Sequence, residues 1–384
     1  MTNKKIDDKT SHNSPSIRFP EFTGEWEKCK IEDITDAVSS GKSKNHFSNG
    51  EYNLYGSTGI IGRTDKALYD GKLVLVARVG ANAGFLQIIN EPCGITDNTL
   101  ILKPKGIDAF YLYYFLQHFN LNRLIFGSGQ PLITGGMLKK VKVSLGTISE
   151  QSKIVKFLSL LDERIATQVR LIDRLQSLMI GLNNSLYEQY GNDITTSFME
   201  LGYSYSGLSG KSAKDFGSGK PFITYLNVYS NIIVDETDYQ YVRINDGEKQ
   251  NIVRTGDVLF TLSSETPEEV GIGSVYLGEK EVYLNSFCFG IHIERNQLAY
   301  SPYLSYYVTS TAFRKFIYPF AQGSTRFNLC KADFEKASIK LPSLDNQKRI
   351  SAMLDCIAEK IRAEKAILEY YNIQWQYLLR QMFI

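Results

Sequence analysis

The chain has 384 residues, of which 43% are hydrophobic and 22% charged, and its formal net charge is +2 at pH 7. This length allows two or three domains with separate cores, and a nearly neutral chain lacks the basic footprint of a protein that binds nucleic acid alone. It has no apolar run long enough to span a membrane, and its five scattered cysteines form no Cys-x-x-Cys pair, which favours a reducing cytoplasm over a disulfide framework.

The order of the predicted segments alternates globular heads with long helices. Residues 1–15 are polar and are expected to form a disordered tail. Residues 16–148 form a first head, 149–192 a long helix, 193–344 a second head and 345–384 a second long helix. Short β-branched runs separated by glycine, with one or two helices, indicate heads of the α+β class, mixed α/β and rich in strands.

The two heads share a weak internal kinship. Each has a Ser-Gly-Lys-Ser motif, at Ser40–Ser43 and at Ser209–Ser212, which are 169 positions apart. Each then has a β-like run behind a glycine, an aromatic helix and a Gly-Ser turn, at 127–130 and at 323–326. The pattern predicts two related heads that have diverged by insertion.

Polar loops flanked by glycine are the candidate DNA-binding elements of the heads. Small hydroxyl side chains and backbone N–H groups position phosphates, while Arg, Asn and Gln contact base edges. For any single residue, a plain turn position is the competing interpretation. The candidates are Lys42, Ser43, Tyr55, Gly56, Ser57, Thr58, Arg78, Asn82 and Gln130 in the first head, and Lys211, Ser212, Ser324, Thr325 and Arg326 in the second.

Both long helices have a heptad seam, in which apolar residues alternate in steps of four and three. A single polar residue interrupts each seam at the same step, which suggests that the two seams face each other. Among the seam positions are Ile154, Leu158, Leu161, Ile165, Gln168 and Leu175 in the first helix, and Ile350, Leu354, Ile357, Ile361, Glu364, Tyr371 and Trp375 in the second.

The helices are an internal repeat at a constant offset of 196 residues, from 143–187 to 339–383. The repeat predicts a pseudo-twofold molecule in which two heads perform one task at two places, held apart by a paired helical ruler. A coiled coil used only for dimerisation is the alternative.

Catalytic motifs are missing. A phosphate loop would need glycine at positions 36 and 205, which are Asp36 and Tyr205. The chain has no [Asp/Asn]-Pro-Pro-[Tyr/Phe] tetrapeptide, and its four histidines are not paired at metal-ligand spacing. We therefore expect no catalytic residues, no metal site and no cofactor bound by this chain.

The helix openings carry a resemblance to a known family. They read Leu-Gly-Thr-Ile-Ser-Glu-Gln-x-Lys-Ile at 145–154 and Leu-Pro-Ser-Leu-Asp-Asn-Gln-Lys-Arg-Ile at 341–350. With Leu-Leu-Asp-Glu-Arg-Ile at 160–165, Arg-Phe-Pro-Glu-Phe at 18–22, Gly-Glu-Trp at 24–26 and Leu-Tyr-Gly-Ser-Thr-Gly-Ile-Ile-Gly at 54–62, the chain resembles the specificity subunit of type I restriction–modification enzymes over nearly all its length.

The resemblance implies a non-catalytic cytoplasmic protein. Each head would be a target recognition domain that reads half of a split, asymmetric double-stranded DNA site. The two helices would pair antiparallel and hold two methyltransferase subunits, and two restriction subunits would join them. S-adenosylmethionine, ATP and magnesium would be bound by those partners.

Three alternatives remain at this point. The chain could serve a related methyltransferase–nuclease system without a translocase, it could be a degenerate enzyme, or it could be a coiled-coil scaffold with protein-binding heads. A neighbouring adenine-methyltransferase gene would separate the first from the last, and methyl transfer by the purified chain would identify an enzyme.

Overall fold

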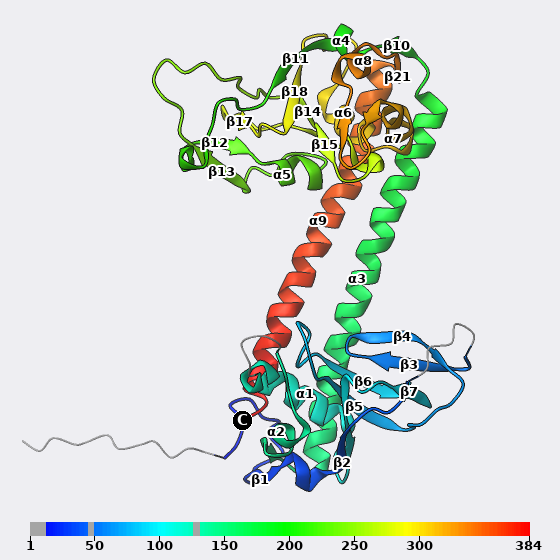
Figure 1. Ribbon diagram of the computed structural model, residues 1–384, viewed down its shortest axis with the longest axis vertical. Coiled ribbons are helices and arrows are strands. Elements are labelled where there is room, and N and C mark those ends of the chain that lie inside the picture. Colours follow the sequence, from blue (N-terminus) through cyan, green and yellow to red (C-terminus); the bar gives the residue numbers. More distant parts are fainter. Residues whose placement is uncertain (1–12, 45–49, 126–130) are drawn as a thin grey trace, which may run out of the picture. The chain divides into compact units, whose positions relative to one another are not determined.

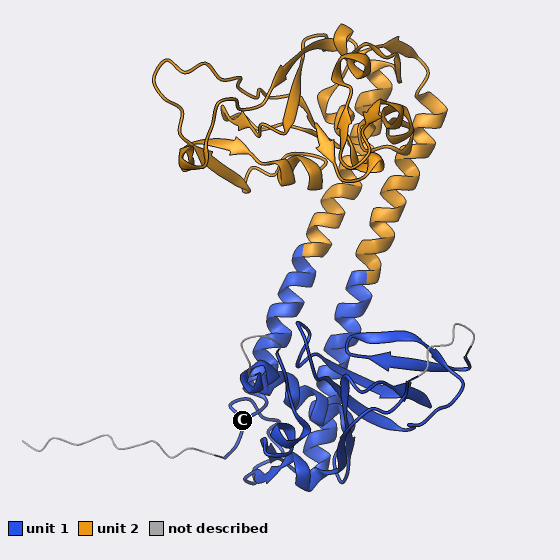
Figure 2. Ribbon diagram, in the orientation of Figure 1, with its two compact units in different colours: residues 1–169, 366–384 blue, residues 170–365 orange. Residues whose placement is uncertain are grey.

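The structure is a computed structural model that describes residues 13–44, 50–125 and 131–384 (Figure 1). It divides into two compact units: unit 1 comprises residues 1–169 and 366–384, and unit 2 comprises residues 170–365 (Figure 2). The unit boundaries fall inside two long helices, α3 (Ile148–Tyr190) and α9 (Leu344–Gln381). Each unit therefore contains one head and a part of each helix.

The head of unit 1 is built on two sheets. The larger is antiparallel, in the order β2 (Thr35–Ser40), β8 (Thr99–Pro104), β5 (Lys72–Ala77) and β6 (Leu86–Asn90). The smaller has the order β4 (Gly59–Thr64), β3 (Tyr52–Gly56) and β7 (Cys93–Ile95), with β3 and β7 parallel. The other elements are β1 (Glu27–Lys30) paired with β9 (Lys142–Leu145), η1 (Ile31–Ile34), α1 (Ala109–Phe119), η2 (Leu121–Leu124) and α2 (Gly135–Lys139).

Strand β5 shows why the head has two layers of core. Its residues Leu73 to Ala77 are all buried. Because successive side chains of a strand point to opposite faces, Val74 and Val76 join the core that includes α1, whereas Leu73 and Leu75 pack with residues of β7. A continuous apolar run is therefore the correct sequence signal for this central strand.

The head of unit 2 repeats this plan. Its larger sheet has the order β11 (Gly202–Ser206), β18 (Cys288–Ile293), β14 (Val258–Thr261) and β16 (Gly273–Val275). Its second sheet has the order β13 (Tyr239–Val242), β12 (Phe216–Ile223) and β17 (Tyr283–Leu284), with β12 and β17 parallel. A third sheet consists of β15 (Ser263–Ser264), β20 (Phe327–Leu329) and β19 (Ala321–Gln322).

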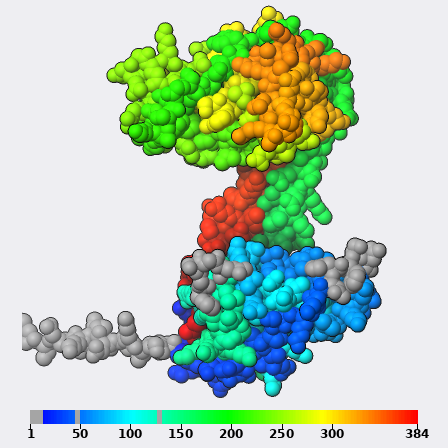
Figure 3. All heavy atoms as spheres, in the orientation of Figure 1, coloured from blue at the N-terminus to red at the C-terminus, as the bar shows by residue number. Residues whose placement is uncertain are grey.

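Short helices and one further strand pair complete unit 2. They are β10 (Ile194–Thr196) with β21 (Ile339–Leu341), α4 (Phe198–Leu201), η3 (Ala213–Asp215), α5 (Tyr225–Ser230), η4 (Pro267–Glu269), α6 (Ser301–Tyr307), α7 (Thr311–Ile317), η5 (Tyr318–Phe320) and α8 (Lys331–Lys336). Figure 3 shows the outer surface of each head with its atoms as spheres. Buried apolar side chains fill the interiors, as expected for close-packed cores.

Equivalent hydrogen bonds fix the register between the two heads. The Thr96 N–H donates to the Tyr55 carbonyl, and the Asn285 N–H donates to the Ile223 carbonyl, both at 3.0 Å. Tyr55 and Ile223 are therefore equivalent. The predicted Tyr-Gly-Ser-Thr-Gly stretch thus has its structural counterpart at the end of β12, where α5 replaces the tight turn between β3 and β4.

The predicted pairing of the two Ser-Gly-Lys-Ser motifs is wrong by three residues. The Gly41 N–H donates to the Thr99 carbonyl and the Gly207 N–H donates to the Cys288 carbonyl. These acceptors hold equivalent positions, opposite the last residues of β5 and β14. Gly207, not Gly210, is therefore the partner of Gly41, and the offset is 166 rather than 169.

Both of these glycines are required by a close approach of backbone. A Cβ at Gly41 would lie 2.3 Å from the carbonyl oxygens of Ile95 and Thr96. At Gly207 it would lie 2.0 Å from the Asn285 carbonyl oxygen. The match between the motifs was a coincidence of residue types, whereas this steric requirement is shared by both heads.

Within each unit, a part of α3 runs beside a part of α9 in the opposite direction (Figure 2). All predicted seam residues are buried or half-buried, including Gln168 and Glu364. In unit 1, Ile154, Leu158 and Leu161 share a core with Leu379 and Met382. In unit 2, Met179, Leu182 and Leu186 pack against the core that contains Ile350 and Leu354. The strand-rich heads, long helices and internal repeat predicted from the sequence are confirmed.

The helices in residues 13–44, 50–125 and 131–384 are all too short or too polar to span a membrane. Within the same ranges, no group of three or more His, Cys, Asp or Glu side chains could hold a metal ion.

Candidate nucleic-acid interface

The predicted binding loops of the first head lie together at the ends of its strands. The Ser57 hydroxyl donates to the Asn98 carbonyl (3.3 Å), and the Arg78 N–H donates to the same carbonyl (2.9 Å). The Ile133 N–H donates in turn to the Arg78 carbonyl (2.9 Å). The turn at 56–58, the loop at 78–82 and the segment that begins at Pro131 are therefore parts of one surface. Gln130 lies outside the described residues.

Tyr55 and Gly56 hold this turn in place from inside the head. The Tyr55 hydroxyl donates to Glu91 Oε1 at 2.6 Å. Burial, and to a smaller extent the Glu91 carboxylate, raise the pKa of Tyr55 to about 12. Gln87 Nε2 donates to the carbonyls of Gly56 and Ser57, at 2.9 and 3.1 Å. Ser57 and Thr58 are thus presented by a turn whose backbone is fixed, which lowers the entropy lost when a ligand binds.

Arg78 follows the last residue of β5 and is half-buried. Its Nη1 donates to Ser40 Oγ at 3.4 Å, and among the described residues its buried Nε has no hydrogen-bond partner. No carboxylate lies within ion-pair distance of the guanidinium in that part of the chain. A guanidinium without a carboxylate partner keeps its capacity to form two parallel bonds with guanine or a phosphate.

Asn82 is exposed and lines a depression of about 320 Å³. Three further amide side chains line the same depression, those of Gln117, Asn120 and Asn122. Asn120 has left-handed backbone geometry (φ 57°), and it ends α1 and begins η2. Carboxamides donate and accept at once, which is the pattern that adenine presents in the major groove.

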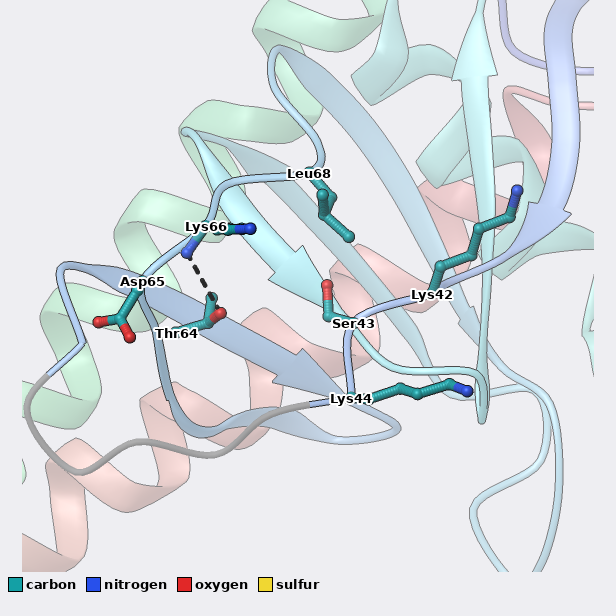
Figure 4. A pocket seen from close by; sticks show the side chains of 7 residues that line it. All are labelled: Lys42, Ser43, Lys44, Thr64, Asp65, Lys66 and Leu68. Atoms are coloured by element: carbon teal, nitrogen blue, oxygen red, sulfur yellow. Dashed lines mark hydrogen bonds between the residues drawn. The ribbon is translucent and has the colours of Figure 1, made fainter.

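Lys42 belongs to a cluster of three lysines (Figure 4). Gly41 and Ser43 bind the backbone of residues 95–99, and Ser43 Oγ accepts from the Ile95 N–H at 3.0 Å. Ser43 is thereby buried and serves the fold, while its neighbours Lys42 and Lys44 are exposed. With Lys66 they line a depression of about 350 Å³, whose other lining residues are Ser43, Thr64, Asp65 and Leu68.

The lysine cluster is a basic surface whose depression is also lined by the carboxylate of Asp65. Among residues 13–44, 50–125 and 131–384, no carboxylate lies within 4.0 Å of the ammonium groups of Lys42, Lys44 or Lys66. Three such ammonium groups around one depression are suited to a phosphate-bearing ligand.

Lys211 and Ser212 of the second head have structural partners of their own. Lys211 Nζ donates to Glu248 and to the Arg243 carbonyl, both at 2.6 Å, and its side chain is only 5% exposed. This ion pair lowers the pKa of Glu248 to about 2. The Ser212 hydroxyl and N–H both donate to Asp215 at 2.8 Å. These contacts tie down a segment that is not equivalent to the Lys42 segment of the first head.

Ser324, Thr325 and Arg326 are exposed in the link between β19 and β20. The Leu329 N–H donates to the Leu262 carbonyl at 2.8 Å, as Ile133 does to Arg78. Leu329 therefore holds the position of Ile133. Phe327, the residue after Arg326, pairs with Ser264 in the segment that follows β14, so the 324–326 link leads directly into this pairing.

Buried polar side chains near the start of each long helix bind the backbone of the preceding head. Gln151 Nε2 donates to the Gly146 carbonyl and Gln347 Nε2 to the Pro342 carbonyl, both at 2.9 Å and 196 residues apart. In unit 1 the Arg164 guanidinium lies over the Tyr371 ring, 5.3 Å from its centroid. Tyr371 and Trp375 are half-buried, and Trp375 packs against the core of unit 1.

Several residues of the two surfaces could not be found from the sequence. Lys44 had a usable signal, because Lys42 and Lys44 flank Ser43 in an alternating pattern. Lys66, Gln117 and Asn122 had none, since they reach the surface only through the pairing of distant segments. In the second head, residues 222–226 are the nearest run in the sequence to the stretch around Tyr55, but the equivalence of this run and the turn at 285–287 become visible only through the register of hydrogen bonds.

The sequence of this chain matches a family model described as the type I restriction modification DNA specificity domain, at residues 23–177 and again at 208–370. Together the two matches cover more than half of the chain. The chain belongs to this family. The resemblance inferred from the helix openings is thereby confirmed, and the two specificity domains correspond to the two halves of the internal repeat.

Curated relatives are specificity subunits. The chain is 24% identical over 306 residues to the type I restriction enzyme MjaX specificity subunit of Methanocaldococcus jannaschii, covering 71% of this chain and 68% of that protein. It is 26% identical over 127 residues to the EcoprrI specificity subunit of Escherichia coli, covering 33% of this chain and 31% of that one. The match to the Escherichia coli protein thus spans less than a third of its length.

Solved structures of specificity proteins share the fold. The S subunit of the type I restriction–modification system of M. genitalium superimposes with a TM-score of 0.59 at 17% identity, covering 97% of this chain and 99% of that chain. A chain from a structure of type I complex assembly and conformational transition gives 0.57 at 15% identity, covering 94% and 97%. At these identities the likeness concerns the fold.

Proposed function

We propose that this specificity-domain protein is the DNA-reading subunit of a type I restriction–modification complex. Each head would read one half of a split, asymmetric site on double-stranded DNA. The observation that carries the proposal is the tandem specificity domain, one copy in each half of a repeated frame. Two equivalent surfaces with different side chains are suited to two different half-sites.

The division of labour follows from the chemistry of the described surfaces. They present a guanidinium, carboxamides, hydroxyls and ammonium groups, which bind bases and phosphates. The complex would owe its chemistry to partners: two methyltransferase subunits with S-adenosylmethionine, and two restriction subunits with ATP and magnesium. This chain would bind none of these cofactors. It would act in the cytoplasm, where the DNA lies.

The two long helices are the proposed mounting for the methyltransferase subunits. Several large apolar side chains are exposed on their outer faces, among them Leu178, Ile180, Tyr370, Ile373 and Tyr377. Exposed apolar residues gathered on one element, such as Tyr370, Ile373 and Tyr377 on α9, are typical of a protein–protein interface. The near-neutral charge of the chain agrees with partners that supply the rest of the DNA-binding surface.

Reconstitution with a cognate methyltransferase subunit tests the proposal. The chain alone should neither methylate nor cut DNA. With that subunit and S-adenosylmethionine, methyladenine should appear at one bipartite site, and omission of this chain should abolish it. Robust methyl transfer by the isolated chain would overturn the proposal, as would a reconstituted activity whose site does not depend on this chain.

A further inference from the structure

The hydrogen-bond register identifies a turn in the second head that the sequence did not reveal. In the first head the Arg78 N–H donates to the Asn98 carbonyl, and in the second the Leu262 N–H donates to the Phe287 carbonyl, both at 2.9 Å. Phe287 therefore occupies the position of Asn98. Asn98 also accepts the Ser57 hydroxyl, so its turn belongs to the candidate interface of the first head.

The same register brings α5 to this place. Tyr55 and Ile223 are equivalent, so the residues that follow Ile223 replace the turn at 56–58. Ile223 is paired with Leu284 in the parallel strands β12 and β17. Leu226 follows Ile223 by three residues, and Phe287 follows Leu284 by three residues. Tyr225 packs against the core cluster that contains Cys288, the neighbour of Phe287. Leu226 and Phe287 thus lie on neighbouring segments.

Both side chains are held out to solvent by a fixed backbone. Leu226 is 67% and Phe287 is 59% exposed. The Thr224 hydroxyl caps α5 by accepting from the Asn227 N–H at 3.1 Å. Asn285 Oδ1 accepts from the Phe287 N–H at 2.9 Å, and the Asn285 carbonyl accepts from the Cys288 N–H at 3.0 Å. Exposure of two large apolar groups costs free energy, yet the surrounding contacts maintain it.

Polar groups beside this apolar pair would complete a reading surface. The Tyr225 hydroxyl donates to the Ser263 carbonyl at 2.8 Å, which joins α5 to β15 (Figure 1). Arg326 comes next to this strand, because its neighbour Phe327 pairs with Ser264 of β15. Glu265 is exposed at the position equivalent to Ala81, and a carboxylate there can accept from the amino group of cytosine.

We propose that Leu226 and Phe287 form an apolar reading surface that contacts the C5-methyl group of a thymine in the half-site read by the second head. That methyl is the only apolar group on a base edge in the major groove. The inference rests on the proposed function. It assigns different chemistry to the two heads, because the equivalent positions in the first head are Thr58 and Asn98.

Replacement of thymine by uracil tests the proposal by removing one methyl group from the DNA. The reconstituted methyltransferase complex is first used to map the bipartite site, and duplexes are then made with uracil at each thymine of the second half-site. Removal of one buried methyl group should weaken binding about fourfold. The Leu226→Ala/Phe287→Ala double variant should bind the thymine and uracil duplexes equally.

A matched control comes from the same head. Met199 is an exposed apolar residue of α4, 51% exposed, and Met199→Ala should keep the fourfold preference for thymine. Uracil in the first half-site should affect wild type and the double variant alike. The single variants Leu226→Gln and Phe287→Gln place polar side chains at these exposed positions and should each reduce the preference, which keeps the test valid if the double variant melts early.

The result that overturns the proposal is a wild-type complex indifferent to uracil throughout the second half-site, or a thymine preference that the double variant retains. A second half-site without thymine has the same effect. A different result would point to insertion of Phe287 between base pairs. In that case, the fluorescence of 2-aminopurine placed in the second half-site would rise on binding, Phe287→Ala would abolish the rise, and uracil would have no effect. Failure of the proposed function is a separate result, because no bipartite methylation site would then appear with wild type.

Discussion

Glu150 is a residue whose charge is fully buried at the first turn of α3. Its carboxylate accepts from Arg18 Nε (2.6 Å), Arg18 Nη2 (2.8 Å) and Trp26 Nε1 (3.1 Å), and its side chain has no exposed surface. Removing one partner of a buried ion pair leaves the other desolvated without compensation. The contact joins the segment before β1 to the long helix, so it fastens the first head to its frame.

We therefore expect Glu150→Ala to destabilise unit 1 by about 3–5 kcal/mol. Both tryptophans of the chain, Trp26 and Trp375, belong to unit 1, so intrinsic fluorescence during urea unfolding reports on that unit. Glu163→Ala is the control, because Glu163 is exposed on the same helix and should change stability by about 0.5 kcal/mol or less. Equal effects of the two variants would contradict the structural role of the pair.

In contrast to Glu150, Arg78 has a side chain that makes few stabilising contacts. Its backbone groups hold the two neighbouring segments, while its guanidinium has one hydrogen bond of 3.4 Å. We expect Arg78→Ala to melt within a few degrees of wild type and to weaken recognition of one half-site by about 1–3 kcal/mol. Methylation of duplexes with single-base changes measures the loss. Discrimination at the other half-site should stay intact, and a large drop in melting temperature would favour a structural role instead.

At this scale the sequence predicts residue types better than residue roles. The loop around Tyr55 and the loop that begins at Arg78 could be found because glycine and small polar residues mark turns. Lys211 shows the limit: its motif is the same as that of Lys42, but its ammonium is paired with Glu248. A buried ion pair between residues 37 positions apart leaves no local signal in the sequence.

At the scale of elements, the segment from Gly41 to Lys44 and the loop after β4 form the three-lysine depression. We expect the Lys42→Ala/Lys44→Ala/Lys66→Ala variant to bind specific and non-specific duplexes more weakly by the same factor. The slope of log K against log salt should fall by about 0.9 for each phosphate that the variant no longer neutralises. Titration of binding at several salt concentrations measures this slope.

The control for the lysine variant removes the same charge elsewhere in the first head. Lys139, Lys140 and Lys142 are exposed around the end of α2 and the start of β9. Their triple alanine variant should leave the slope unchanged. A reduced slope in both variants would mean that overall charge, rather than the depression, governs the salt dependence.

The length of the helices is the second element whose role can be tested. Insertion of one heptad between Thr167 and Gln168, with a matching heptad beside Glu364, keeps the seams in phase and adds about 10 Å of helix. The gap between the half-sites should lengthen by about three base pairs while the bases read stay the same. Methyladenine mapping gives the answer. An active variant with an unchanged gap would refute the ruler.

The helices could be predicted and the register of the heads could not. A heptad seam is a local sequence pattern. The spacing of Ile154, Leu158 and Leu161 therefore identifies the buried face of the helix without information from the rest of the chain. The register of the heads depends on which strands pair, and that information is carried by pairs such as Gly41 with Thr99 and Gly207 with Cys288. Alignment of the two Ser-Gly-Lys-Ser motifs by residue type alone gave a register error of three residues.

At the scale of the whole molecule, the last residues of the chain complete the core of its first head. Phe383 lies against Tyr111, Phe115 and His118, with ring centroids 5.2 to 6.4 Å apart, and is 4% exposed. The Ile17 N–H donates to the Gln381 carbonyl at 3.0 Å. Tyr187, 196 positions earlier, packs against Tyr307 in the second head. The repeat therefore places the end of each helix in a core, and for α9 that core is in unit 1.

We expect Phe383→Ala to destabilise unit 1 by about 3–5 kcal/mol, the usual cost of removing a buried aromatic ring. Tryptophan fluorescence during unfolding reports the shift. Hydrogen exchange should show amides of unit 2 protected as in wild type. Ile384→Ala serves as the control because Ile384 is 44% exposed. Loss of protection in both units alike would show that they unfold as one.

This arrangement reverses the usual order in which a chain matures on the ribosome. Domains generally fold as units from the N-terminus while synthesis proceeds. Unit 2 is continuous, so it is complete once residue 365 has left the exit tunnel. Unit 1 must wait for residues 366–384, which are made after unit 2 is complete. The head that is translated first is therefore finished second, and a nascent chain stalled before Phe383 would carry a finished second head and an unfinished first one.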